Sequence, residues 1–488
     1  MISINNKEHW LIQQAFRFPK RTALVSYERI ITYRQLYNEC LQYANIIYSL
    51  GVRSKDHVGI LFGHDVNFFK VINSLWFIGA VPILLSFRET DVEIKIKLKQ
   101  ADIKYLLIDE TLKQKYSSIQ FQQKIFCTNE IIPDTEISKS NRIPFSYKAN
   151  NPALILFTSG SSGRPKAVVH TFNSLFESVK AIDSFADLSQ KDLWLAGLPL
   201  YHIGGFMILC RSLVAGSAVA FPESLNHKHF VNGLKHFNPS HISFVPTTLF
   251  KLINENTAPN KNLKYSFLGG GPSEAQLSLD SFAKGWPVVK VYGSSETCSM
   301  VTILHPRNLM LKAASSGKPI YKNKIKIKYA YKREDDGAGE IFIQTPSLFK
   351  YYYDKKHIVK TNKTNTWFST GDLGRLDNDG YLFVKTRREE IIISGGENVS
   401  AKEVESALKS IPKVKDVYVF PVEDKKWGQI VCAAIVGKGI SEKEIKSYLK
   451  GKISGYKIPK KIFFLNNITK NEMGKVNREI LLKKISPD

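Results

Sequence analysis

Short apolar runs alternate with helix-spaced apolar positions through most of the chain before residue 339. Residues 58–62 (VGILF) and 105–109 (YLLID) have the composition of short buried strands, and residues 67–80 carry apolar side chains at helical spacing. The runs 241–246 and 288–292 predict two further buried strands. Strands that alternate with helices are typical of a layered α/β fold with a mostly parallel sheet.

The pattern changes near Gly339, after which short strands and turn residues predominate. Residues 373–376 and 381–384 flank the turn sequence DNDG at 377–380, which predicts a β-hairpin. Further on, Ser400-Ala401-Lys402-Glu403 matches a capping box and predicts a helix that begins there.

The last hundred residues therefore have a character of their own. Strands are expected at 417–420, 431–435 and 462–465, around the helix that follows Ser400. We expect an α/β protein with a large N-terminal domain, residues 1–387, made of layered α/β subdomains plus a β-rich subdomain. A small, mobile α+β C-terminal domain is expected over residues 388–488, with the hinge at 387–390.

The longest apolar stretch runs from residue 193 to residue 210. Pro199 and the pair Gly204-Gly205 interrupt it, and Arg211 closes it, so we interpret it as a buried strand and loop rather than a membrane span. The first ten residues include Lys7 and Glu8 and show no secretory signal. The five cysteines are scattered in a pattern that fits neither a disulfide framework nor a zinc site, which favours a cytoplasmic protein.

Composition limits the possible partners. The chain has 488 residues, 43% of them hydrophobic, which excludes a disordered protein and indicates more than one domain. Its 69 Lys+Arg against 44 Asp+Glu give a net charge of +25. A nucleic-acid-binding protein would concentrate this charge near exposed aromatic residues, whereas here it is spread evenly. We therefore expect no nucleic-acid partner and no integral membrane segment, and the sequence does not fix the oligomeric state.

The strongest local signal is an apolar run that leads into a turn rich in glycine and hydroxyl groups. Residues 154–157 precede Thr158-Ser159-Gly160-Ser161-Ser162-Gly163-Arg164-Pro165-Lys166. Glycines let backbone N–H groups approach phosphate oxygens, hydroxyls add donors, and Lys166 supplies positive charge. The spacing differs from that of a Walker A loop. The segment predicts a phosphate-binding loop, with an ordinary polar loop as the alternative.

This loop resembles the phosphate loop of the adenylate-forming superfamily, which holds acyl- and aryl-CoA ligases, peptide-synthetase adenylation domains and luciferases. Other segments resemble that family's motifs in the family's order. They are Leu268-Gly269-Gly270-Gly271, Tyr292-Gly293-Ser294-Ser295-Glu296-Thr297, Ser369-Thr370-Gly371-Asp372, Gly395-Gly396-Glu397-Asn398 and Met473-Gly474-Lys475. The resemblance extends over nearly the whole chain and implies an enzyme that uses ATP and Mg²⁺.

The resemblance also implies roles for individual residues in ATP binding. Tyr292 would stack on adenine, Asp372 would bind the ribose hydroxyls, and Arg387 would contact ribose or phosphate. Glu296 would bind Mg²⁺, and Ser295, where the family usually has Thr, would reach the α-phosphate. The full expected ATP site comprises Thr158, Ser159, Gly160, Ser161, Ser162, Gly163, Lys166, Gly269, Gly270, Tyr292, Gly293, Asp372 and Arg387.

Two half-reactions follow from the family likeness. Lys475 would stabilise the charge that builds up while a carboxylate attacks the α-phosphorus of ATP. The small domain would then rotate about Glu389, where the family usually has Asp or Lys, and bring Gly395 and Gly396 to the tunnel for coenzyme A. The expected catalytic groups are Lys475, His202, Ser295 and Glu296.

A separate segment is expected to bind the acyl substrate. Leu198-Pro199-Leu200-Tyr201-His202 resembles the family's loop that carries the substrate-side histidine, so His202 would contact the acyl carboxylate. Arg211 lies in an apolar stretch, where a buried arginine requires an anionic partner. It is either part of a structural ion pair or the group that binds a second carboxylate of a dicarboxylic acid.

These features, together with Ala167 after the loop lysine, are similar to those of o-succinylbenzoate–CoA ligases of menaquinone biosynthesis. We therefore expect an ATP-dependent carboxylate–CoA ligase that forms an acyl-adenylate from a small carboxylic acid. Ligases for other aryl, fatty or short dicarboxylic acids remain alternatives. So does a free-standing adenylation enzyme that loads a carrier protein.

Overall fold

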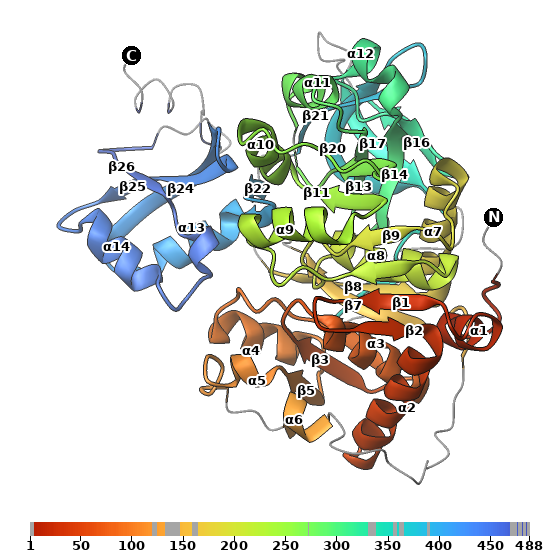
Figure 1. Cartoon of the computed structure of the whole chain (residues 1–488). Coiled ribbons are helices and arrows are strands. Elements are labelled where there is room, and N and C mark those ends of the chain that lie inside the picture. The colour runs from red at the N-terminus through yellow and green to blue at the C-terminus, as the bar shows by residue number, and fades with distance from the viewer. Residues whose placement is uncertain are drawn as a thin grey trace. The chain divides into compact units, whose positions relative to one another are not determined.

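The structure is a computed structural model (Figure 1), and it describes residues 4–119, 124–131, 147–158, 164–271, 273–329, 338–354, 359–360, 366–387, 391–468, 476, 481 and 485. The chain forms two units that interleave in sequence. The first comprises Met1–Phe87, Leu98–Phe157 and Ala167–Lys385, and the second comprises Arg88–Lys97, Thr158–Lys166 and Thr386–Asp488.

One sheet carries the strands on either side of the expected phosphate loop. Its strand order is β19-β18-β8-β7-β4-β3-β5-β6, and the pairs from β7 to β6 are parallel. Its members are β3 (His57–Leu61), β4 (Val81–Leu84), β5 (Tyr105–Ile108), β6 (Lys124–Cys127), β7 (Pro152–Thr158), β8 (Lys166–Thr171), β18 (Tyr351–Tyr353) and β19 (Val359–Lys360). The predicted strands at 58–62 and 105–109 are confirmed within a residue.

A second sheet carries the expected adenine-side motifs. Its order is β15-β14-β13-β12-β11-β9-β10-β1-β2, parallel from β13 to β1 and antiparallel at both edges. Its members are β1 (Thr22–Val25), β2 (Ile30–Thr32), β9 (Leu193–Leu195), β10 (Ala218–Ala220), β11 (His241–Phe244), β12 (Tyr265–Leu268), β13 (Val288–Ser294), β14 (Ser299–Leu304) and β15 (Lys318–Pro319). The expected layered α/β class with mostly parallel sheets is confirmed.

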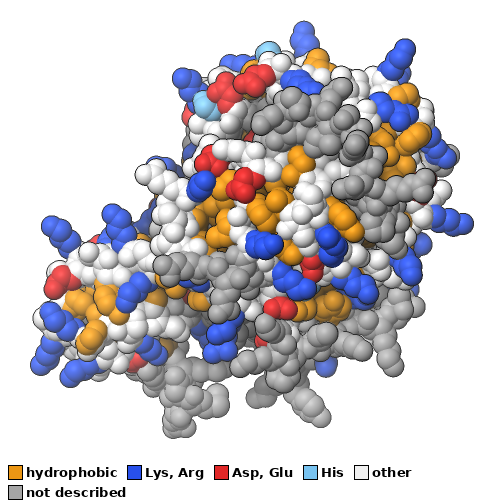
Figure 2. Space-filling model, turned by 90° about the horizontal axis from the view of Figure 1, so that it is seen from below, with side chains coloured by type: hydrophobic (Ala, Val, Ile, Leu, Met, Phe, Trp, Pro, Cys, Tyr) orange, Lys and Arg blue, Asp and Glu red, His pale blue; other side chains and the backbone are white. Residues whose placement is uncertain are grey.

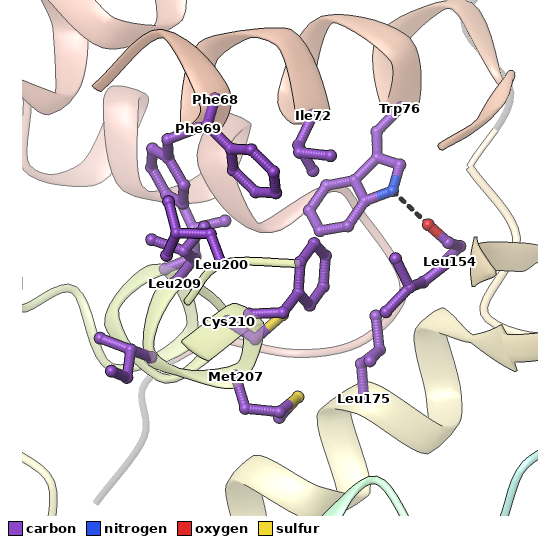
Figure 3. Close-up of a cluster of buried hydrophobic side chains, with 14 of the residues drawn as sticks. Phe68, Phe69, Ile72, Trp76, Leu154, Leu175, Leu200, Met207, Leu209 and Cys210 are labelled. Atoms are coloured by element: carbon purple, nitrogen blue, oxygen red, sulfur yellow. Dashed lines mark hydrogen bonds between the residues drawn. The ribbon is translucent and has the colours of Figure 1, made fainter. Parts of the chain in front are cut away.

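Helices pack on these sheets and enclose an apolar core. The α-helices that the structure describes before residue 401 are α1 (Trp10–Arg17), α2 (Tyr33–Ser49), α3 (Val66–Ile78), α5 (Glu110–Lys113), α6 (Thr128–Ile131), α7 (Phe172–Ala186), α8 (Ile203–Ala215), α9 (His227–Phe237), α10 (Pro246–Asn254), α11 (Ala275–Ala283) and α12 (Leu309–Lys312), together with α4 (Asp91–Gln100), most of which belongs to the second unit. Figure 3 shows side chains of α3 facing those of α8, with Leu154 from β7 and Leu175 from α7 beside them. Trp76 closes this cluster by donating its indole N–H to the Ala153 carbonyl oxygen over 2.7 Å.

The stretch 193–210 was expected to be a strand and a loop, and the second half of that prediction is wrong. β9 is followed by a short loop, but from Ile203 the chain forms the buried helix α8. Gly205 lies inside this helix, and a Cβ atom there would lie 2.2 Å from the Pro199 carbonyl oxygen. The glycine therefore allows the first turn of α8 to pack closely on the preceding loop.

The β-rich part expected from Gly339 onward begins earlier, and it is a four-stranded antiparallel sheet with the order β16-β17-β20-β21. Its members are β16 (Lys324–Lys328), β17 (Gly339–Gln344), β20 (Phe368–Leu376) and β21 (Leu382–Arg387). The predicted hairpin joins β20 to β21. Its turn is closed by the Asp377 N–H, which donates to the Tyr381 carbonyl oxygen, and Gly380 adopts φ +81°. This hairpin places Asp372 on β20.

The second unit contains the small α+β fold predicted for the end of the chain. Its sheet joins β22 (Ile391–Ser394), β23 (Glu397–Ser400), β24 (Val414–Asp424), β25 (Gly428–Gly437) and β26 (Lys461–Phe464), covered by α13 (Ala401–Lys409) and α14 (Glu442–Leu449). Ser400 caps α13 by accepting a hydrogen bond from the Glu403 N–H. The reciprocal half of the expected capping box is not made, because the Glu403 carboxylate instead binds Lys457 at 2.7 Å.

Lys457 is the centre of a buried ion cluster within this unit. Its ammonium group lies 2.5 Å from Glu93 and 2.7 Å from Glu403, and only 7% of the lysine is exposed. Ser454 donates a further hydrogen bond to Glu93. Burial alone lowers the pKa of Lys457, but the two carboxylates outweigh it and hold the pKa above its ordinary value.

The face of the molecule shown in Figure 2 has no single patch of positive charge among its described residues. On the face shown in Figure 2, lysine and arginine side chains are scattered, with acidic and apolar groups between them. None of the helices that the structure describes has the length and apolar character needed to cross a membrane.

Candidate active site

Tyr292 and Asp372 lie side by side, although they come from different sheets. Tyr292 is on β13, and its phenolic hydroxyl donates a 2.6 Å hydrogen bond to a carboxylate oxygen of Asp372 on β20. The Asp372 backbone is also held, because its N–H donates to the Thr370 hydroxyl over 3.0 Å. A phenol ring beside an ordered carboxylate offers a stacking surface and an acceptor for hydroxyl groups, which is what a nucleoside needs.

Glycines shape the sheet edge around this pair. Leu268 is opposite Lys290 in the parallel β12–β13 pair, so the turn Gly269-Gly270 continues alongside the end of β13. A Cβ atom at Gly269 would lie 2.6 Å from Val291, and Gly270 adopts φ +77°. The glycine motif therefore permits a turn that side chains would block.

Ser295 and Glu296 begin the turn between β13 and β14. Glu296 is buried, with 8% of its surface exposed, and its carboxylate accepts a hydrogen bond from the Tyr352 hydroxyl over 3.0 Å. Its own carbonyl oxygen accepts from the Phe349 N–H over 2.7 Å. Mg²⁺ in ATP-dependent enzymes is usually held by one or two carboxylates together with phosphate oxygens. Glu296 follows Tyr292 by four residues, just beyond the end of β13, and its carboxylate fits that requirement. It would be the residue that holds the ion.

His202 is the residue immediately before α8. Its side chain makes no capping hydrogen bond to the helix, and its ring packs edge-on against Tyr201 with 4.7 Å between ring centroids. The N-terminus of a helix carries partial positive charge, so a carboxylate that approaches His202 meets a favourable field.

Arg211, further along α8, is fully buried. One guanidinium nitrogen donates to the Ser299 hydroxyl over 3.2 Å, and the guanidinium lies 5.4 Å from the ring of Trp194. Its other two nitrogens, Nε and Nη1, have no hydrogen-bond partner among the described residues. Burial lowers the pKa of Arg211 to about 10, so the group is still a cation at neutral pH.

A buried cation of this kind is costly unless an anion reaches it. In the part of the chain that the structure describes, no carboxylate forms an ion pair with Arg211. Among the described residues, Arg211 therefore has no carboxylate with which to form the structural ion pair considered from the sequence. Each of these two nitrogens can donate a charge-assisted hydrogen bond to a carboxylate oxygen.

The second unit holds the glycine pair expected at the coenzyme A tunnel. Gly395 and Gly396 form a two-residue hairpin turn between β22 and β23, with φ +61° and +86°. The Gly395 N–H donates to the Trp427 carbonyl oxygen, and a Cβ atom at Gly395 would lie 2.8 Å from the Trp427 ring. Glycine is therefore required by both the turn and the indole packed against it.

Some expected site residues cannot be placed. β7 ends at Thr158 and β8 begins at Lys166, but residues 159–163 between them lie outside the described residues. The same holds for Glu389 and Lys475, while Arg387 is described only as the last backbone position of β21. The roles expected for these residues stay predictions.

Sequence reasoning missed three residues that support the site. Tyr352 binds Glu296, Trp427 packs on Gly395, and His170 on β8 makes a 2.7 Å hydrogen bond to the Ser295 carbonyl oxygen. No motif marks them. The one available signal is a histidine in the apolar strand sequence AVVHT, where a polar side chain must find a partner.

The chain matches two protein-family models. Residues 11–353 match the family described as AMP-binding enzyme, and residues 403–475 match the AMP-binding enzyme C-terminal domain.

Similar proteins of full length are also known. The chain is 31% identical to a 2-succinylbenzoate–CoA ligase from Bacillus subtilis, over 98% of each chain. A double mutant of o-succinylbenzoate CoA synthetase from that organism, bound with the product analogue OSB-NCoA, superposes with a TM-score of 0.90 at 31% identity, covering 97% of this chain and 98% of that one. Structures of the same synthetase with the acyl-adenylate intermediate OSB-AMP and with ATP and magnesium give TM-scores of 0.74 and 0.73, each at 31% identity. The first covers 98% of both chains, the second 97% of this chain and 99% of the other.

Proposed function

The chain belongs to the AMP-binding enzyme family, and from that premise we propose that it is an ATP-dependent 2-succinylbenzoate–CoA ligase of menaquinone biosynthesis. The curated and solved relatives carry this activity or its ligands in their names, and the likeness extends over nearly the full length of both chains. ATP, Mg²⁺ and coenzyme A are its cofactor and co-substrates.

The observation that carries the choice of substrate is the buried Arg211 guanidinium. A monocarboxylic acid needs one recognition group for its reacting carboxylate, and His202 at the start of α8 supplies it. Arg211 lies nine residues further along, about 13 Å at the rise of an α-helix, and in this proposal it serves a different carboxylate. A dicarboxylic acid with its second carboxylate on an aromatic ring gives the buried cation its missing partner.

In the first half-reaction, the substrate carboxylate attacks the α-phosphorus of ATP, and pyrophosphate leaves. Tyr292 and Asp372 would hold the nucleoside, and Glu296 would hold Mg²⁺, which would neutralise phosphate charge. We assign Lys475 to the charge that develops between the carboxylate and the α-phosphate. No covalent bond to the protein is needed, so catalysis rests on positioning and electrostatics.

In the second half-reaction, the thiol of coenzyme A attacks the acyl-adenylate, and AMP leaves. We assign the approach of the pantetheine arm to Gly395 and Gly396, whose lack of side chains leaves the backbone open. In this proposal residues 388–488 act as a mobile domain that turns about Glu389 between the two steps.

We further propose a cytoplasmic location, which is where free thiols persist. All five cysteines are unpaired and buried.

The test is a panel of acids offered to the purified protein with ATP, Mg²⁺ and coenzyme A, with AMP and the thioester measured by mass spectrometry. We expect o-succinylbenzoate to give both products. The matched control is 4-oxo-4-phenylbutanoate, which lacks only the ring carboxylate and should react much more slowly. Preference for a fatty or short dicarboxylic acid would identify a different ligase, and AMP release that coenzyme A does not accelerate would indicate a carrier-loading enzyme.

A further inference from the structure

The turn that carries Ser295 and Glu296 is held by its backbone carbonyl groups. Residues 295–298 connect β13 to β14, and each of their four carbonyl oxygens accepts a hydrogen bond from a group outside the turn. The donors are His170 Nε2 to Ser295 at 2.7 Å, Phe349 N to Glu296 at 2.7 Å, Ser347 Oγ to Thr297 at 2.9 Å and Ser178 Oγ to Cys298 at 2.6 Å. Three of these four donors are side chains, so the sequence specifies this arrangement residue by residue.

This support is needed because the turn is strained. Cys298 and Ser299 both adopt the left-handed backbone region, with φ +58° and +87°, which residues other than glycine rarely occupy. Gly293, just before the turn, lies so close to β14 that a Cβ atom would be 1.7 Å from the Ser299 carbonyl oxygen. Such a conformation persists only where surrounding groups enforce it.

His170 is the donor whose chemistry is best defined. The residue is fully buried on β8, and burial lowers its pKa to about 4, so the ring is neutral at physiological pH. A carbonyl oxygen can only accept, which places the ring hydrogen on Nε2. Nδ1 then lies 3.2 Å from the Ser174 hydroxyl.

Two neighbouring strands hold two successive residues of the motif. β8 supplies His170 to the Ser295 carbonyl oxygen. β18 pairs with β8, with Tyr352 opposite Val168, and supplies the Tyr352 hydroxyl to the Glu296 carboxylate over 3.0 Å. The peptide group that His170 holds is the one that joins Ser295 to Glu296. The orientation of this peptide determines the direction in which the Glu296 side chain leaves the backbone.

We propose that His170 is a positioning residue for adenylation, which orients the Ser295–Glu296 peptide and thereby the carboxylate that holds Mg²⁺ on ATP. This inference rests on the proposed function in one respect, namely that Glu296 is the Mg²⁺ ligand. His170 itself touches neither substrate nor metal.

The experiment compares His170→Gln with His170→Asn. Both changes replace the ring by an amide, but the glutamine amide nitrogen reaches the place of Nε2, whereas the asparagine amide nitrogen reaches only the place of Nδ1. Mg·ATP binding is measured by calorimetry in the absence of the carboxylic acid substrate. The Mg²⁺ concentration for half-maximal pyrophosphate exchange is then measured in the presence of that substrate. We expect the Gln variant to stay within about threefold of the wild type and the Asn variant to bind Mg·ATP about tenfold more weakly, because it loses a buried hydrogen bond.

His9→Asn is the matched control. His9 is also buried, packs against Trp76 and Phe77, and uses its Nδ1 to accept from the Leu11 N–H. This variant should lose thermal stability and keep wild-type Mg·ATP binding. If it weakens Mg·ATP binding as much as His170→Asn does, general destabilisation explains both and the proposal is overturned.

Further outcomes would overturn either the role of His170 or the proposed function. Equal Mg·ATP affinities for the Gln and Asn variants, or wild-type affinity for both, would overturn the role of His170. A wild-type protein that binds Mg·ATP but converts no acid would instead contradict the proposed function, and the comparison of variants by calorimetry would still decide the present inference.

Discussion

Tyr292 and Asp372 are 80 residues apart in the sequence, yet the phenol of the first donates a 2.6 Å hydrogen bond to the carboxylate of the second. The bond joins a strand of the nine-stranded sheet to a strand of the four-stranded sheet. It therefore links the residue assigned to adenine with the residue assigned to ribose, and it orders the carboxylate of Asp372, a residue of which only 7% is exposed.

Tyr292→Phe should weaken ATP binding without preventing the reaction. The ring that we assign to adenine stacking remains, but Asp372 loses a donor, and one hydrogen bond to a charged group is worth about 1.5–3 kcal/mol. We expect the KM for ATP to rise about tenfold or more, with the KM for the acid little changed. Steady-state kinetics with each substrate varied in turn will check this, and an equal rise in both KM values would contradict the assignment.

Arg211→Met should separate substrate recognition from stability. Without the guanidinium, kcat/KM for o-succinylbenzoate should fall about ten- to a hundredfold, while 4-oxo-4-phenylbutanoate is little affected. The melting temperature of the free protein should stay level or rise, because an unpaired buried cation is replaced by an apolar side chain of similar volume. A large fall in melting temperature together with equal losses for both acids would indicate a structural arginine.

Lys475→Ala should separate the two half-reactions. The lysine is assigned to adenylation, so the variant should lose carboxylate-dependent pyrophosphate exchange while still converting a preformed acyl-adenylate and coenzyme A to thioester. The two rates are measured separately. Equal losses in both would show that Lys475 has no role specific to adenylation.

Lys457→Met should destabilise the second unit, because Glu93 and Glu403 would be left buried without their cation. Removing one partner of a buried ion pair costs about 3–5 kcal/mol. Hydrogen exchange of α13, measured by mass spectrometry on the full chain, should become much faster. Lys452→Met is the control, since Lys452 is exposed and lies over the Tyr448 ring. Equal exchange in the two variants would rule out the stabilising role of the cluster.

Acid should destabilise the protein through its buried histidines. The pKa of His170 and that of His64 are both lowered to about 4 by burial, from 6.5 in the unfolded chain. Between these values the unfolded state binds more protons, so stability is complete above about pH 6.5 and falls as the pH drops towards 4. His170→Gln should make the decline of melting temperature with falling pH shallower over this window. An unchanged slope would mean that His170 is not buried in its neutral form.

Much of the fold follows from local patterns. The strands at 58–62, 105–109 and 288–292 and the hairpin at 377–380 are confirmed, because apolar runs and turn residues act over a few positions. The helix α8 was missed, since Pro199 and the glycines at 204 and 205 indicate interruption. Only the close approach of Gly205 to the Pro199 carbonyl oxygen, a tertiary contact, explains why glycine stands there.

The site residues likewise divide into those that could be predicted from the sequence and those that could not. Motif residues such as Tyr292, Glu296 and Asp372 could be named from the sequence, because their order along the chain resembles that of a known family. His170 and Tyr352 could not, because each acts through a hydrogen bond to a residue far away in sequence. Glu403 was expected to complete a capping box, but its carboxylate instead forms an ion pair with the buried Lys457.

The most direct measurement omits coenzyme A. Purified protein is mixed with o-succinylbenzoate, ATP and Mg²⁺, quenched with acid and analysed by mass spectrometry. We expect the mixed anhydride of o-succinylbenzoate with AMP, together with pyrophosphate, and its conversion to the thioester and AMP once coenzyme A is added. Formation of ADP and phosphate, or the absence of any acyl-adenylate, would contradict it.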